Sequence, residues 1–152
     1  MYSLTEKKII NTLKELRKRT GIISSFLFTE DGFIIAIDGA NINENEDYYQ
    51  SIAAICAEVI AFAEHGVDII NDKNFIKQIK IQAGNQLDDT GFMIILHLIT
   101  NEIMISVVFP IYLNYGVLLF ELNQTINRLG EYFSNLSRTN NLEMVSNSIK
   151  QS

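Results

Sequence analysis

Cysteine, proline and tryptophan are almost missing from this chain of 152 residues, which has one Cys, one Pro and no Trp. Because Cys56 has no second cysteine to pair with, the chain can form no intrachain disulfide and has no cysteine-based zinc motif. The N-terminus lacks the short apolar core of a secretory signal, and the most apolar stretches, 92–99 and 103–113, are too short for a membrane span of ~20 residues. We therefore expect a cytoplasmic protein that spans no membrane.

The sequence also lacks the motifs of common catalytic and nucleotide-binding sites. It contains no GxxxxGKS or GxxxxGKT phosphate-binding loop, no GxGxxG loop, no GxSxG elbow and no HExxH metal motif. The two histidines, His65 and His97, lie at a predicted helix end and inside a predicted strand. The helix dipole and a hydrogen bond within the sheet explain these positions without catalysis.

Two acidic pairs could suggest a metal site, but their setting argues against one. Glu30-Asp31 and Asp88-Asp89 each lie at a predicted turn that contains a glycine, where carboxylates favour the turn geometry. Neighbouring carboxylates on one tight turn seldom converge on an ion without further ligands. We therefore expect no catalytic residue, no metal and no cofactor, and predict that the protein is not an enzyme.

Charge is unevenly distributed along the chain. The net charge is −6, yet residues 1–20 hold six Lys and Arg residues against two Glu. A globally acidic chain repels phosphate backbones, which argues against nucleic-acid binding. The basic segment is either a solvated outer face or a contact for an acidic partner or membrane surface, and the sequence leaves both interpretations open.

The first half of the chain predicts a helix followed by a hairpin. Ser3 and Glu6 fit a capping box, and Ile9, Ile10, Leu13 and Leu16 recur on one face of a helix over 4–19. Two apolar segments, 22–29 and 33–38, flank Asp31-Gly32 and predict a β-hairpin. Both of its strands are apolar enough to be covered on both faces.

A second helix, over 47–64 and ending at Gly66, is apolar almost all round. Ile52, Ile55, Cys56, Val59, Ile60 and Ala63 form a stripe suited to the domain's own sheet, and small residues occupy much of the rest. A second apolar face needs a partner helix, unless other helices of the monomer cover it. Together with the polar edge strand over 75–82, this second apolar face predicts a homodimer interface. The interface residues are Ala53, Ala54, Ala57, Ile60, Ala61, Phe62, Ile76, Gln78 and Lys80.

The second half predicts three strands and a helix. Segments 92–99 and 103–109 are nearly continuous apolar runs and suit central strands, and Leu119, Leu122, Ile126, Leu129 and Phe133 define one face of a third helix. The predicted fold class is α+β, in three α/β/α layers around a five-stranded antiparallel sheet, with the order α-β-β-α-β-β-β-α. We expect one domain over 1–135 and a flexible or loosely helical tail over 136–152.

This element order, with Asp31-Gly32 at the first turn, Asp38-Gly39 at the hairpin's end and an alanine-rich helix next, resembles the Roadblock/dynein-light-chain family. The resemblance implies a fold shared with profilin, with the first and third helices on one sheet face and the second on the other. It also implies homodimers, or heterodimers with a Roadblock paralogue, through the second helix and the third strand. Its members bind Ras-like small GTPases as regulators or scaffolds.

The same architecture allows a second function. Profilin-, longin- and PAS-like domains of this size include small-ligand sensors, which need an apolar cavity with a few convergent polar groups. Within the predicted strands, His97 and Ser106 are the candidates for such groups. The leading prediction is a non-enzymatic dimeric module that binds a Ras-like GTPase, and the alternative is a sensor.

Overall fold

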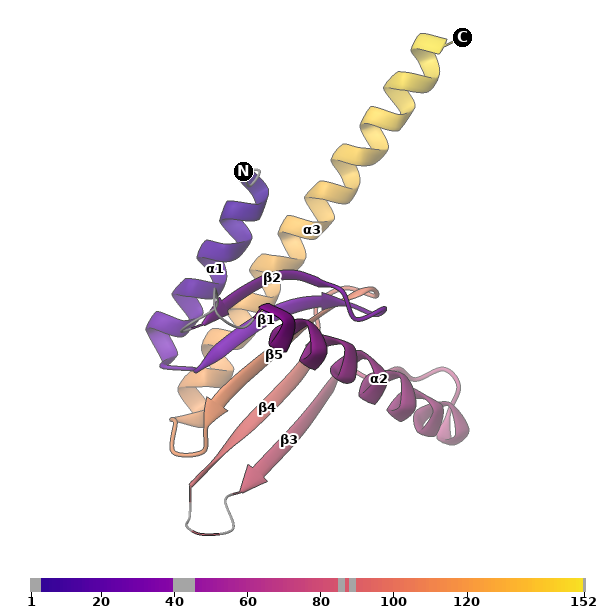
Figure 1. Cartoon of the computed structure of the whole chain (residues 1–152). Helices are drawn as coiled ribbons and strands as arrows, with labels where there is room; N and C mark the ends of the chain where they lie inside the picture. The colour runs from indigo at the N-terminus through magenta and orange to yellow at the C-terminus, as the bar shows by residue number, and fades with distance from the viewer. Residues whose placement is uncertain (1–3, 40–45, 85–86, 88–89, 152) are drawn as a thin grey trace.

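The computed structural model describes residues 4–39, 46–84, 87 and 90–151, with the side chains of residues 46 and 139–151 left out. The described elements follow the predicted order (Figure 1). They are α1 (Leu4–Thr20), β1 (Ser24–Thr29), β2 (Ile34–Gly39), α2 (Glu46–Ile70), β3 (Gln78–Gly84), β4 (Gly91–Leu98), β5 (Ile103–Pro110) and α3 (Tyr115–Gln151). Ser3 of the predicted capping box and the pair Asp88-Asp89 lie outside the described residues.

The five strands form one antiparallel sheet in the order β2-β1-β5-β4-β3. This order confirms that the polar third strand is an edge and that β4 and β5 are central. The prediction that both hairpin strands are covered on two faces is wrong for β2, the other edge. A bulge opposite Leu27 and Phe28 leaves Ile35 without a register partner, and both Ile35 and the preceding Phe33 are exposed.

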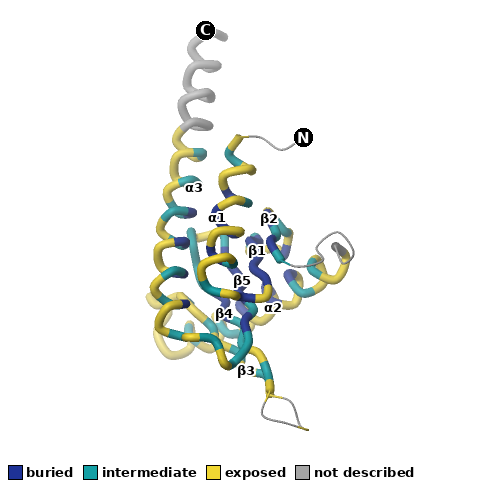
Figure 2. Tube along the Cα trace, turned by 90° about the vertical axis from the view of Figure 1, so that its left-hand side faces the viewer, coloured by how far each residue is buried: buried dark blue, intermediate teal, exposed yellow. Residues whose placement is uncertain are grey.

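Helices cover both faces of the sheet, with α1 and α3 on one face and α2 on the other (Figures 1 and 2). This arrangement confirms the predicted three layers. One core cluster joins α1 and α3 to the sheet through Leu13, Leu16, Leu118, Leu122 and Leu129. A second, smaller cluster joins α2 to Phe26, Phe28, Leu96 and Met104.

The β1–β2 turn fixes the start of α2. Gly32 has a φ of +86°, which glycine adopts without steric strain, and its amide donates to the Thr29 carbonyl at 2.9 Å. A Cβ on Gly32 would lie 2.9 Å from the Cα of Ala54. The Gln50 side chain also donates a 2.7 Å hydrogen bond to the Gly32 carbonyl. The turn predicted from Asp31-Gly32 thus contacts α2 directly, in addition to the packing of α2 on β1.

Two helices extend further than the sequence suggested. The prediction that the second helix ends at Gly66 is wrong, because α2 continues through it to Ile70. A Cβ on Gly66 would meet nothing within 4 Å, and its backbone stays helical rather than capping the helix. The backbone of α3 is helical to Gln151, so the residues assigned to the tail prolong this helix. The domain boundary at residue 135 stays a prediction.

Candidate interaction surface

The buried face of α2 is made of small or compact side chains. Ala53, Cys56, Ala57 and Ile60 pack against Phe26 and Phe28 of β1, Leu96 of β4 and Met104 of β5. Small residues let the helix approach the sheet closely. Beyond Ile60, no residue of α2 is fully buried, and only Ala63 and Val67 are half-buried, so the described part of the chain covers the last part of the helix only partly.

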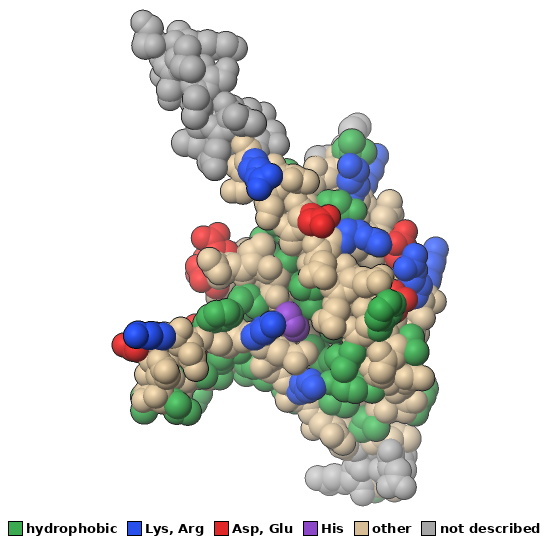
Figure 3. All heavy atoms as spheres, turned by 180° about the vertical axis from the view of Figure 1, so that it is seen from behind, with side chains coloured by type: hydrophobic (Ala, Val, Ile, Leu, Met, Phe, Trp, Pro, Cys, Tyr) green, Lys and Arg blue, Asp and Glu red, His purple; other side chains and the backbone are tan. Residues whose placement is uncertain are grey.

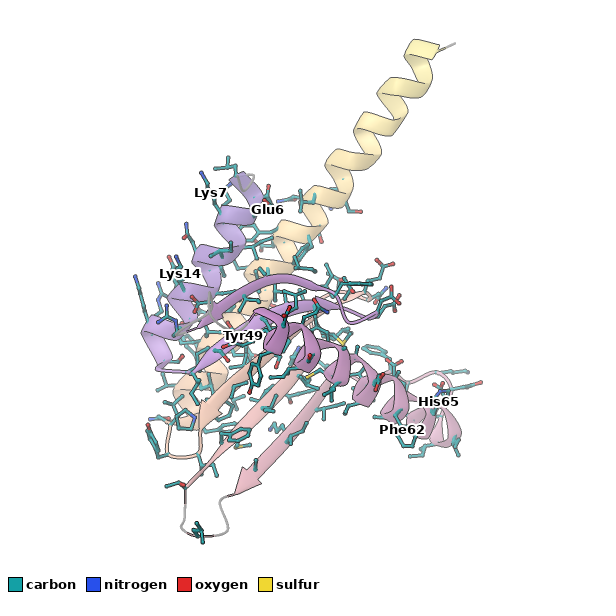
Figure 4. All side chains as sticks on the ribbon, viewed as in Figure 1. Glu6, Lys7, Lys14, Tyr49, Phe62 and His65 are labelled. Atoms are coloured by element: carbon teal, nitrogen blue, oxygen red, sulfur yellow. The ribbon has the colours of Figure 1, made fainter. Side chains whose placement is uncertain are left out.

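The exposed face of α2 carries large apolar side chains at regular spacing. Ile55 is 59% exposed, Phe62 82% and Ile69 87%, and Tyr48 and Val59 are also exposed. Together with the half-buried Ile52 and with Gly66, these positions alternate by four and three residues along the helix, which is the pattern of a helix that pairs with another helix. Figure 4 labels Phe62 on the half of α2 that projects beyond the sheet. We call Tyr48, Ile55, Val59, Phe62 and Ile69 the α2 stripe.

The two faces of α2 are therefore assigned differently from the prediction. Ala53, Ala57 and Ile60, expected at the dimer interface, are buried against the chain's own sheet, whereas Ile55 and Val59, expected on the sheet, are exposed. The polar residues of the helix, among them Asp47, Glu58 and His65, leave two apolar faces, and the periodicity alone did not identify which of these packs on the sheet. The 4-3 spacing of its large residues was the signal that could have identified the outer stripe.

The other expected interface residues stay on the surface. Ala54, Ala61 and Phe62 of α2 are exposed, as are Gln78 and Lys80 of β3, and Ile76 is half-buried. Among the described strands, β3 pairs only with β4, which leaves its outer backbone edge open. The Lys80 ammonium lies 5.0 Å from the centroid of the Tyr115 ring, so this side chain already has an attractive contact within the chain.

Charge is segregated on the two sides of the sheet. The helix α2 contains five Asp and Glu residues and no Lys or Arg, whereas α1 contains six Lys and Arg residues and two Glu. Basic side chains gather over α1 on the right-hand side of Figure 3. The α2 side therefore favours a partner with basic groups around an apolar centre.

A pocket of about 240 Å³ opens between α2 and the ends of β4 and β5. Its lining includes Glu30 and Glu64 at the rim, Leu96 and Met104 at the base, and His97. Ser106, the second residue expected in a sensor cavity, is fully buried and does not line it. The pocket therefore does not bring together the two polar groups that the sensor alternative required.

The candidate chemical groups have structural explanations. His97 Nδ1 lies 2.7 Å from the Leu98 carbonyl and donates to it, as the prediction of a hydrogen-bonded sheet residue required, and burial lowers the pKa of its ring. Burial raises the pKa of the Cys56 thiol to about 11, so the reactive thiolate is disfavoured. Within the described residues, no three His, Cys, Asp or Glu side chains gather as a metal site, and no helix is long and apolar enough to cross a membrane.

The architecture matches solved structures of Roadblock proteins. MglB from Myxococcus xanthus is 18% identical over 90% of this chain and 95% of its own, with a TM-score of 0.74. An MglB described as having a tetrameric arrangement is 14% identical over 87% and 92%, with a TM-score of 0.72. A Roadblock/LC7 domain from Streptomyces avermitilis is 14% identical over 82% and 97%, with a TM-score of 0.69. No family model and no curated protein sequence matches the chain. These structures confirm the architecture that the resemblance implied, and the chain has the Roadblock/LC7 fold.

Proposed function

We propose that the protein is a non-enzymatic dimeric interaction module that binds a Ras-like small GTPase and regulates or scaffolds it. The observation that carries the proposal is the α2 stripe, on a helix that shares a pocket with Ile76 and Lys77, just before the edge strand β3. Monomeric soluble proteins rarely expose a continuous apolar stripe on a central helix, whereas a second copy would cover it. The Roadblock fold and the MglB structure with a tetrameric arrangement support self-association.

The GTPase part of the proposal depends on the family resemblance and on the sequence. The chain has no phosphate-binding loop, so the nucleotide chemistry would belong to the partner. Any effect on hydrolysis would then come from positioning the partner's own catalytic groups. A two-fold dimer would present both acidic α2 helices on one side, as a single platform for a basic partner surface.

Light scattering tests the dimer. At micromolar concentration the wild type should have about twice the chain mass, and Phe62→Asp should be monomeric, because it places a carboxylate at the centre of the apolar contact. The matched control is Phe120→Asp, since Phe120 is an exposed aromatic residue on α3, on the other face of the sheet. A monomeric wild type, or a dimer that survives Phe62→Asp, would contradict the proposed interface.

Titration against small GTPases encoded near this chain tests the partner. Each candidate is presented bound to GDP or to a GTP analogue, and at least one should bind the wild type and the Phe120→Asp control in one nucleotide state. Binding to none of them would favour the sensor alternative. Turnover of GTP by the isolated chain would refute the non-enzymatic part of the proposal.

A further inference from the structure

Three lysines form a line along the outer side of α1. Lys7, Lys14 and Lys18 are spaced by seven and four residues, so they lie within about 40° of one another around a helix of 3.6 residues per turn. All three are exposed. Figure 4 shows Lys7 and Lys14 pointing outward from α1, away from α3. We call these three residues the lysine stripe.

The lysines differ from the arginines of the same helix in having no ion pair within the described part of the chain. Arg17 binds Asp38 with an Nε to Oδ2 distance of 2.7 Å, and Arg19 lies 3.5 Å from Glu121. The nearby Glu15 is held by Arg128 at 3.1 Å. The arginines are therefore engaged in ion pairs within the fold, whereas no salt bridge among the described residues neutralises the lysine stripe.

The chemistry of this surface favours a diffuse anionic partner. A lysine ammonium is a mobile, strongly hydrated point charge, whereas shaped protein sites favour the planar arginine fork. The lysine stripe lines none of five well-formed pockets among the described residues, and exposed Leu4 lies near it at the start of α1. We propose that the outer face of α1 binds the surface of an anionic lipid bilayer.

The charge segregation would orient the bound protein. The acidic α2 lies on the opposite face of the sheet and would be repelled by the same membrane. The α2 surface would then face away from the lipid. This inference goes beyond the proposed GTPase function and does not depend on it. Dimerisation would only strengthen the binding, by adding a second lysine stripe.

Cosedimentation with lipid vesicles tests the inference on the full chain. The wild type should bind phosphatidylcholine vesicles containing about 30% phosphatidylserine at low ionic strength, and should dissociate as salt is raised. Each lysine near such a surface strengthens partitioning about fivefold, so Lys7→Gln/Lys14→Gln should weaken it on the order of 25-fold. The control Lys73→Gln/Lys77→Gln removes the same net charge from exposed lysines before β3, and should change binding less than about threefold.

Three results would overturn the inference. The first is no binding to the anionic vesicles at low salt, which would leave the lysine stripe to an acidic protein or to solvent. The second is an equal loss of binding in the two double variants, which would mean that only net charge matters. The third is undiminished binding to pure phosphatidylcholine. Thermal melts followed by circular dichroism should be the same for both variants, because these lysines are exposed.

Discussion

A pair of alanines one turn apart on α2 separates folding from surface effects. Ala57 is buried against Phe26, Phe28 and Leu96, whereas Ala61 is exposed, although the sequence assigned both to the dimer interface. We predict that Ala57→Asp strongly destabilises the fold and that Ala61→Asp does not. Aspartate suits the comparison because its side chain is short: at position 57, which is 7% exposed and lines the pocket between α2 and the sheet, the carboxylate loses most of its contact with water.

The expected magnitudes differ severalfold. An unpaired carboxylate buried at position 57 should cost about 3–5 kcal/mol, a large part of the 5–15 kcal/mol that stabilises a typical domain. For a chain of this size, this cost lowers Tm by roughly 6–20 °C. At position 61 the carboxylate stays in water, and repulsion from Glu58 and Glu64, three residues away on either side, costs only about 0.5 kcal/mol per pair.

Thermal melts followed by circular dichroism check this prediction. Both substitutions are made in the Phe62→Asp background at equal protein concentration, so that any effect on association is common to the two. We expect Ala61→Asp to melt within a few degrees of its parent, by the estimate above. Equal Tm values for the two variants, or a larger loss for Ala61→Asp, would refute the assignment of the faces of α2.

Three further predictions concern the rest of the molecule. Arg17→Ala leaves the carboxylate of Asp38, which is 1% exposed, without its ion pair, and should lower stability by about 3 kcal/mol in denaturant titrations, against less than about 1 kcal/mol for the exposed Arg19→Ala. Because burial lowers the pKa of His97, the unfolded chain binds its proton more readily, so stability should fall as pH drops below about 6.5. This fall should be smaller in His97→Gln. Deleting residues 136–152 should change Tm little, and a drop of more than about 8 °C would mean that they stabilise the core.

The fold was predictable because its elements carry local signals. The basic amphipathic helix, the Asp31-Gly32 turn and the two apolar segments of β4 and β5 each fit one secondary structure. The errors occurred where local patterns are weak. Gly66 was predicted to end the helix but lies inside α2. An exposed glycine within a helix lowers stability by only about 1 kcal/mol relative to alanine, which is too little to end the helix. The bulge that exposes Ile35 arises from the register in which β2 pairs with β1. The sequence of β2 by itself does not specify that register.

The exposed apolar face of α2 was predicted at the level of the element and not of the residue. A second apolar face on α2 was expected and is present, but Ala53 and Ala57 are buried and Ile55 and Val59 are exposed. Alanines suit a close helix-sheet contact as well as a close helix-helix contact, so their size did not identify their partner. The contacts of Gln50 and Ala54 with the turn at Gly32 help to set which face of α2 packs on the sheet. These are tertiary contacts, which the sequence of the helix alone does not contain.

The two proposed surfaces lie on opposite layers of the molecule, which makes them separable by experiment. The α2 stripe and the acidic side chains of α2 lie on one side of the sheet, and the lysine stripe of α1 lies on the other. Sites that share no side chains contribute additively unless a change in shape couples them. Phe62→Asp should therefore remove dimerisation and lower vesicle binding only by the loss of the second lysine stripe. Lys7→Gln/Lys14→Gln should leave the dimer mass and GTPase binding in solution unchanged, because neither lysine touches α2.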